Sequence, residues 1–180
     1  MEDSKLNAYR SLAQAWQYPY PGLLAELQEG AQKFPRDSAR KAFASFLAAL
    51  RRLSLGEWEE LYTHTLDLNP AIAPYIGYQL WGDGYPRGNF MAALNRAYRD
   101  AAMEMEGELP DHMGCVLGFL ETGSPPPPEL VEAFEPAVQK MLTTLRKAEP
   151  ANPYVYLLEA VAYTVDLKTV EIQQDIVQES

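Results

Sequence analysis

Apolar residues recur along this chain at intervals of three and four positions, the spacing that puts them on one face of an α-helix. Start signals accompany the stripes: Ser4 and Asp37 stand where they can cap helices, and Ser54 and Glu57 have the spacing of a capping box. The clearest apolar stripe consists of Phe43, Phe46, Leu47 and Leu50. The patterns predict eight or nine helices, over residues 4–18, 21–30, 37–50, 54–66, 75–81, 86–107, 110–120, 129–148 and 153–170.

The sequence has no convincing strand pattern and no internal repeat, so we predict an all-α fold. A length of 180 residues fits a single globular helical domain over residues 1–180. Residues 123–128 end in four consecutive prolines and are expected to form a stiff linker, because polyproline is extended. Pro136 is expected to kink the helix over 129–148, and the polar tail, 171–180, is expected to fray.

The charge balance narrows the class of partner. Lys plus Arg number 15 and Asp plus Glu number 25, which gives a net charge of −10. Nucleic acid is an unfavourable partner, because binding it requires Lys and Arg to neutralise phosphates. A basic partner would be attracted at long range, although the charge is equally explained by solubility alone.

Cysteine usage and hydropathy indicate a cytoplasmic protein. Cys115 is the single cysteine, lies among apolar residues and is expected to be a buried structural thiol. Residues 1–5 are polar and do not resemble a secretory signal. No apolar run approaches the ~18 residues that span a membrane, so we expect no membrane insertion.

Neither a metal site nor a phosphate loop is predicted. His64 and His112 are the only histidines, and no paired spacing of metal ligands is present. Gly82, Gly84 and Gly88 do not have Walker A spacing, and no lysine follows them. We therefore predict no catalytic residue, no metal and no cofactor.

Aromatic and charged side chains gather instead around two predicted turns. Tyr75, Tyr78 and Trp81 are concentrated in one short helix, and such aromatic residues anchor binding partners well. Charged residues follow at Asp83 and Arg87 and again at Glu108, Asp111 and His112. This pattern is typical of a peptide-binding groove.

A purely structural interpretation of the same residues remains open. Tyr78 and Trp81 would then be core residues, and Arg87 would pair with Asp83 or Glu108. Asp111 would cap the helix after Pro110, and His112 would bond a nearby backbone group.

Several of these segments, read in order, resemble a known family. The segments are Tyr62 to Asp67, Gly77-Tyr78, Gly82-Asp83, Arg87-Gly88, Tyr98 and Glu108-Leu109-Pro110-Asp111-His112. This chain resembles the NarJ branch of the NarJ/TorD/DmsD chaperones, which mature redox enzymes, and the resemblance covers about residues 58–120. Met113 replaces a leucine common in NarJ-like chains, and residues 74–78 and the four prolines also depart from the enterobacterial pattern.

The resemblance implies an all-helical chaperone without enzymatic activity. Its partner would be the apo catalytic subunit of a respiratory molybdenum enzyme such as nitrate reductase (NarG-like), bound through the subunit's N-terminal peptide. The chaperone would support insertion of the molybdenum cofactor and delay membrane docking or export. Proteins of molybdenum cofactor biosynthesis are further candidate partners, and the chaperone itself would be a monomer or a dimer.

By motif match, the resemblance assigns peptide binding to part of one set of residues. The aromatic residues of the same region complete that set. The set is Tyr75, Tyr78, Trp81, Asp83, Arg87, Tyr98, Glu108, Pro110, Asp111 and His112. Our hypothesis is that Asp111 or Glu108 meets a basic group of the peptide, while Tyr78 and Trp81 line its apolar part. Two alternatives stay open: proofreading of twin-arginine leaders, and a small nucleotide-binding protein or hydrolase that uses Asp83, Arg87 and His112.

Overall fold

Nine α-helices account for most of residues 2–168, the part of the chain that this computed structural model describes. These residues contain no β-strand, so the predicted all-α fold and number of helices are confirmed. A 3₁₀ turn, η1 (Ala31–Lys33), follows α2, and a π-helical turn, η2 (Thr63–Asp67), follows α4. The α-helices are α1 (Glu2–Ala15), α2 (Leu23–Gly30), α3 (Asp37–Leu50), α4 (Leu55–Tyr62), α5 (Ile76–Trp81), α6 (Tyr85–Asp100), α7 (Met113–Glu121), α8 (Pro128–Ala148) and α9 (Pro153–Thr164).

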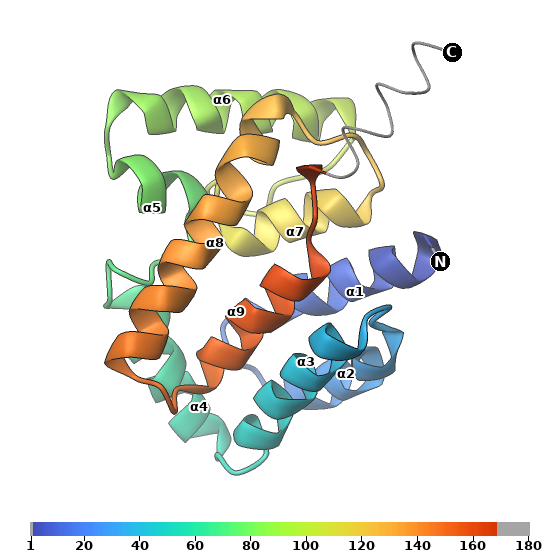
Figure 1. The fold of residues 1–180 in the computed structure, drawn as a ribbon, viewed down its shortest axis with the longest axis vertical. Helices are drawn as coiled ribbons and strands as arrows, with labels where there is room; N and C mark the ends of the chain where they lie inside the picture. The colour runs from blue at the N-terminus through green and yellow to red at the C-terminus, as the bar shows by residue number, and fades with distance from the viewer. Residues whose placement is uncertain (1, 169–180) are drawn as a thin grey trace.

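The helices pack as one domain in which partners are distant in sequence. Helix α3 packs along α9, α1 packs along α7, and α5 and α9 both pack against α8. Figure 1 shows α8 and α9 side by side across the middle of the molecule, with α4 below them and α6 above. Helices α5, α6 and α7 therefore share the upper half of that view, where the candidate residues lie.

Aromatic side chains from α3, α4, α9 and the turn after α1 meet in the core. The Tyr154 ring lies 6.2 Å from the Trp16 ring and 5.5 Å from the Phe46 ring, measured between centroids. The indole N–H of Trp58 donates to the Tyr154 hydroxyl over 3.2 Å. All four side chains are buried, and each contributes apolar burial worth roughly 1.5–3 kcal/mol.

Of the predicted helix starts, the capping box is confirmed. The Ser54 hydroxyl accepts from the Glu57 amide over 3.2 Å, and the Glu57 carboxylate accepts from the Ser54 amide over 2.7 Å. Ser4 is not a cap: it lies inside α1, and its hydroxyl donates to the Lys33 carbonyl over 2.8 Å, tying α1 to η1. Asp37 is the first residue of α3, and Arg36 occupies the cap position.

Helix α6 ends at Asp100, whereas the sequence predicted a helix over 86–107. The chain turns at Ala102, which has a φ of 53°. Positive φ is unfavourable for alanine because its Cβ approaches the backbone, so this position usually holds glycine. The stop signal was therefore invisible in the sequence, and residues 103–108 form an irregular segment instead of a helical turn.

Backbone hydrogen bonds stabilise this early stop. The Met103 amide donates to the Tyr98 carbonyl over 2.9 Å, and the Ala102 amide donates to the Arg99 carbonyl over 3.0 Å. These two bonds have the pattern of a Schellman motif, which satisfies carbonyls at a helix end.

The later helices differ less from expectation. Pro136 lies inside α8, which runs from Pro128 to Ala148, so the last of the four prolines belongs to the helix and not to the linker. Helix α9 ends at Thr164, before the predicted 170. The tail, 171–180, lies outside the described residues.

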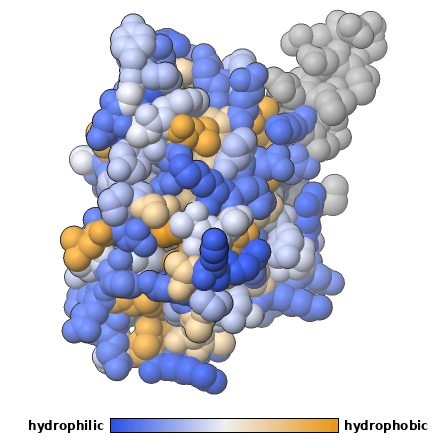
Figure 2. All heavy atoms as spheres, turned by 60° about the vertical axis from the view of Figure 1, so that its left-hand side comes forward, coloured by the Kyte–Doolittle hydropathy of each residue, from blue (hydrophilic) through white to orange (hydrophobic). Residues whose placement is uncertain are grey.

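No helix within residues 2–168 has the length and apolarity needed to cross a membrane. The face in Figure 2 is mainly hydrophilic, and hydrophobic colour is confined to small, separated patches.

Candidate functional site

Arg87 is the centre of the cluster that the sequence singled out. Its Nε and Nη2 donate to the two carboxylate oxygens of Asp111, over 2.9 and 3.1 Å, and its Nη1 donates to Asp83 over 3.1 Å. Asp111 is fully buried, and the hydrogen bond to it is the main reason that the pKa of Arg87 is raised. A two-pronged pair of this kind fixes both side chains in one geometry.

Two tyrosine rings cover the guanidinium group. The Arg87 carbon Cζ lies 5.5 Å from the ring centroid of Tyr75 and 5.4 Å from that of Tyr78. Both distances are within the range of a cation–π interaction. We call Arg87, Asp111, Asp83, Tyr75 and Tyr78 the arginine brace.

Gly77 of α5 allows the brace to close. A Cβ atom at this position would lie 2.9 Å from Asp111 Oδ2 and 3.0 Å from Arg87 Cγ. Both distances are too short for ordinary contacts, so glycine is required here by the close approach of α5 to the ion pair. Packing against the ion pair thus explains why glycine stands before Tyr78.

A short backbone bridge joins the start of α5 to the turn before α7. The Ile76 amide donates to the Asp111 carbonyl over 2.8 Å, and the Met113 amide donates to the Pro74 carbonyl over 2.7 Å. Below the bridge, the buried Tyr98 hydroxyl donates to the Pro110 carbonyl over 2.7 Å. Tyr98 and Pro110 therefore position the turn from beneath.

His112, and not Asp111 or Pro110, caps the start of α7. Its Nδ1 accepts from the Gly114 amide over 3.1 Å, which is the role of a helix cap and requires the proton of the neutral ring to be on Nε2. Its ring also packs edge-on against Tyr75, 5.2 Å between centroids. Burial lowers the pKa of His112, against the opposing effect of Glu108, Asp111 and Asp67.

Glu108 is exposed and connects the brace to the surface. One carboxylate oxygen accepts from the Tyr75 hydroxyl over 2.8 Å and from the Leu109 amide over 3.0 Å. Burial, followed by this hydrogen bond, raises the pKa of Tyr75. The other carboxylate oxygen makes no hydrogen bond within residues 2–168.

Glu108 and His112 also line a groove of about 580 Å³ between α1, α7 and residues 103–108. Its carboxylates come from Glu104, Glu106, Glu108 and Glu121. Its apolar surface comes from Trp16, Tyr18, Tyr62, Met103, Met105 and Cys115. We call this the acidic groove; Arg10 is the one cation among its described lining residues, and it pairs with Glu121.

The sequence interpretation missed most of the acidic groove. Residues 103–106 read Met-Glu-Met-Glu, and in the structure the two methionines are half-buried while the two glutamates are exposed. That alternation was visible in the sequence, but it was hidden by assigning 86–107 to one helix. Tyr18, which packs edge-on against Tyr62 at 5.2 Å, had no local signal.

Asp111 and Trp81 do not lie where the peptide hypothesis put them. The Asp111 carboxylate is enclosed by Arg87 and presents no surface to a partner in this structure. Trp81 packs on Phe90, 5.4 Å between centroids, and lines a separate pocket of about 570 Å³ between α5, α6 and α8. Tyr78 faces Arg87, so Trp81 and Tyr78 do not share a wall with Glu108.

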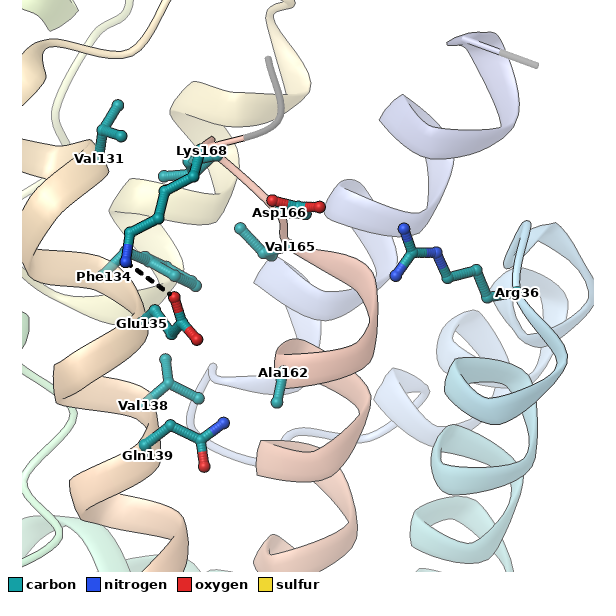
Figure 3. Close-up of a pocket in the computed structure, with 11 residues that line it drawn as sticks. Arg36, Val131, Phe134, Glu135, Val138, Gln139, Ala162, Val165, Asp166 and Lys168 are labelled. Atoms are coloured by element: carbon teal, nitrogen blue, oxygen red, sulfur yellow. Dashed lines mark ion pairs between the residues drawn. The ribbon is translucent and has the colours of Figure 1, made fainter. Parts of the chain in front are cut away.

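A third pocket, of about 260 Å³, lies between α8 and α9 (Figure 3). Lys168 reaches across it to Glu135, 3.2 Å away, and Arg36 stands on its opposite side. Its lining has both positive and negative side chains and none of the residues that the sequence predicted. Its charges therefore do not select one class of ligand.

The remaining chemistry is limited. No cluster of three or more metal-binding side chains occurs within residues 2–168. Burial raises the pKa of the Cys115 thiol to about 11, so it is protonated at neutral pH. All three guanidinium nitrogens of Arg87 donate to carboxylates, and a phosphate would have to displace them.

A scan of the chain against protein-family models finds no match, and a search of curated proteins finds none either.

Proposed function

We propose that this chain is a binding protein, not an enzyme, and that its acidic groove holds a basic, amphipathic segment of a client protein. One observation carries the proposal: four carboxylates and a floor of methionine and aromatic side chains share a groove of about 580 Å³. Carboxylates attract a basic segment, and the apolar floor takes up its hydrophobic side chains. The net charge of −10 adds long-range attraction.

In this proposal the arginine brace has a supporting role. It holds the turn that presents Glu108 and His112 to the groove, through Asp111 and the backbone bridge to α5. Preorganised groups bind more tightly because less conformational entropy is lost on binding. The residues that hold the turn then act through it and need not touch the client. They are Asp83, Arg87, Asp111, Tyr78, Tyr98 and Pro110.

The resemblance to the NarJ branch supplies the identity of the client. We propose the N-terminal segment of a molybdenum-enzyme catalytic subunit in its cofactor-free form, held until the cofactor is inserted. An acidic groove supports this assignment because a basic, amphipathic N-terminal segment complements it in charge and polarity.

Peptide titration tests the groove. Two short synthetic peptides contain equal numbers of arginine and leucine, in alternating order or in the order of an amphipathic helix. Reversing two groove charges, Glu104→Lys with Glu106→Lys, should weaken the tighter peptide by about tenfold or more in calorimetry. The matched control, Glu129→Lys with Glu132→Lys, changes the net charge equally on α8.

Equal losses in the two double variants would mean that only net charge matters, and the groove proposal would be wrong. Absence of binding by both peptides would also contradict it.

Co-purification tests the client. The chain should retain a cofactor-free molybdenum-enzyme catalytic subunit and release the same subunit once its cofactor is bound. Retention of both forms alike would contradict a role in maturation and favour a static scaffold.

A further inference from the structure

Residues 103–106, along one wall of the acidic groove, have the side-chain pattern of a β-strand although they belong to no sheet. Met103 and Met105 pack against the hydrophobic core, and Glu104 and Glu106 are exposed. Alternation between two faces is the period of an extended strand. All four residues line the groove.

The backbone of this wall is unpaired. Within residues 2–168, the amides and carbonyls of Glu104, Met105 and Glu106 take part in no hydrogen bond. Backbone groups in this state are a template onto which another chain can add as a strand. Trp16, which also lines the groove, is fully buried, and its indole N–H has no acceptor among the described residues.

Both ends of the segment are fixed. At its start, the left-handed turn at Ala102 and the bond from the Met103 amide to Tyr98 hold it to α6. At its end, Gly107 has a φ of 74°, and Glu108 is bound by the Tyr75 hydroxyl. An edge anchored at both ends loses little conformational freedom when a strand pairs with it.

We propose that the client segment binds in an extended conformation, as a strand added to residues 103–106. This inference rests on the proposed function and specifies its partner: basic residues at every second position lie beside Glu104 and Glu106, and apolar residues between them lie beside Met103 and Met105. A helical segment repeats every 3.6 residues and keeps its backbone bonds internal, so it matches neither the alternation nor the unpaired edge.

The two arginine–leucine peptides separate the conformations, because they have identical composition and charge. The alternating peptide should bind the full chain about tenfold more tightly than the helix-ordered one. Methylating the backbone nitrogens of the alternating peptide along one edge should weaken it by about tenfold, whereas methylation along the opposite edge should not. Isotope-edited infrared spectra of the bound peptide should show a β-type amide band.

Tighter binding by the helix-ordered peptide, still sensitive to Glu104→Lys with Glu106→Lys, would overturn the extended mode and leave the proposed function intact. Tight binding of the alternating peptide that neither methylated edge affects would also overturn it. Failure of both peptides to bind would overturn the proposed function and this inference together.

Discussion

The arginine brace and the acidic groove are neighbours built from the same kinds of side chain, and they use their carboxylates in opposite ways. Asp111 in the brace is fully buried, and both of its carboxylate oxygens accept hydrogen bonds from Arg87. Glu104 and Glu106 in the groove are exposed and make no ion pair within residues 2–168. A carboxylate therefore contributes to stability where it is buried and paired, and remains available for recognition where it faces water.

The largest expected effect comes from the buried carboxylate. Asp111→Asn leaves the Arg87 charge largely buried without its main partner and should lower the free energy of unfolding by about 3–5 kcal/mol. Asp83→Asn is the matched control: its side chain is 87% exposed, so the loss should stay within about 0.5 kcal/mol. Urea denaturation measures both.

Equal losses of unfolding free energy in these two variants would contradict the idea that the buried carboxylate of the brace contributes more to stability than an exposed one. Charge reversal at Glu104 and Glu106 should, in contrast, weaken peptide binding with little change in the urea midpoint.

The next effect tests the packing of the brace. Gly77→Ala places a methyl group 2.9 Å from Asp111 Oδ2 and should destabilise the fold by about 1–3 kcal/mol. Gly88→Ala on α6 is the control, since nothing lies within 4 Å of the added atom and alanine favours a helix by about 0.5–1 kcal/mol. Opposite signs in thermal unfolding would confirm that Gly77 is required by contact; a neutral Gly77→Ala would refute it.

A smaller, pH-dependent effect belongs to His112, where brace and groove meet. Burial lowers its pKa in the folded state, so the unfolded chain takes up the proton more readily. Stability should therefore fall as the pH decreases through about 6.5, the ordinary value for histidine. Asp67 works in the opposite direction at lower pH, because burial and the charge of Glu108 raise its pKa.

His112→Asn separates the titration from the cap. Asparagine can still accept the Gly114 amide at the start of α7, but it does not titrate. The variant should lose less stability than the parent between neutral pH and the acidic side of 6.5, as measured by urea denaturation at several pH values. If the slope of stability against pH were the same in the variant and the parent, the pKa of His112 would not be lowered by folding.

Sequence reasoning recovered what local periodicity encodes. The stripe of Phe43, Phe46, Leu47 and Leu50 and the box of Ser54 with Glu57 are properties of single helices, and both were found where expected. Pairings across the chain were harder, because no local signal links residues that meet only after folding.

The brace shows this limit clearly. Arg87 was expected to pair with Asp83 or Glu108; it pairs with Asp83, one helical turn away, and with Asp111, which the sequence assigned to capping. His112 takes the capping role instead. Two acidic residues three positions apart, Glu108 and Asp111, could not be told apart without the direction of each side chain.

The smallest predicted effect concerns Ala102, the residue at which the chain turns after α6. Ala102→Gly removes the strain of a left-handed alanine and should stabilise the fold by about 0.5–1 kcal/mol, the strain relieved less the added entropy of the unfolded chain. Ala92→Gly, at an exposed position inside α6, should cost about as much as Ala102→Gly gains. The backbone bonds that end α6 at Asp100 are the same in the parent and in Ala102→Gly. Peptide affinity should therefore not change in Ala102→Gly. A stability gain with weaker binding would show that the groove edge needs the stiffness that alanine gives this turn.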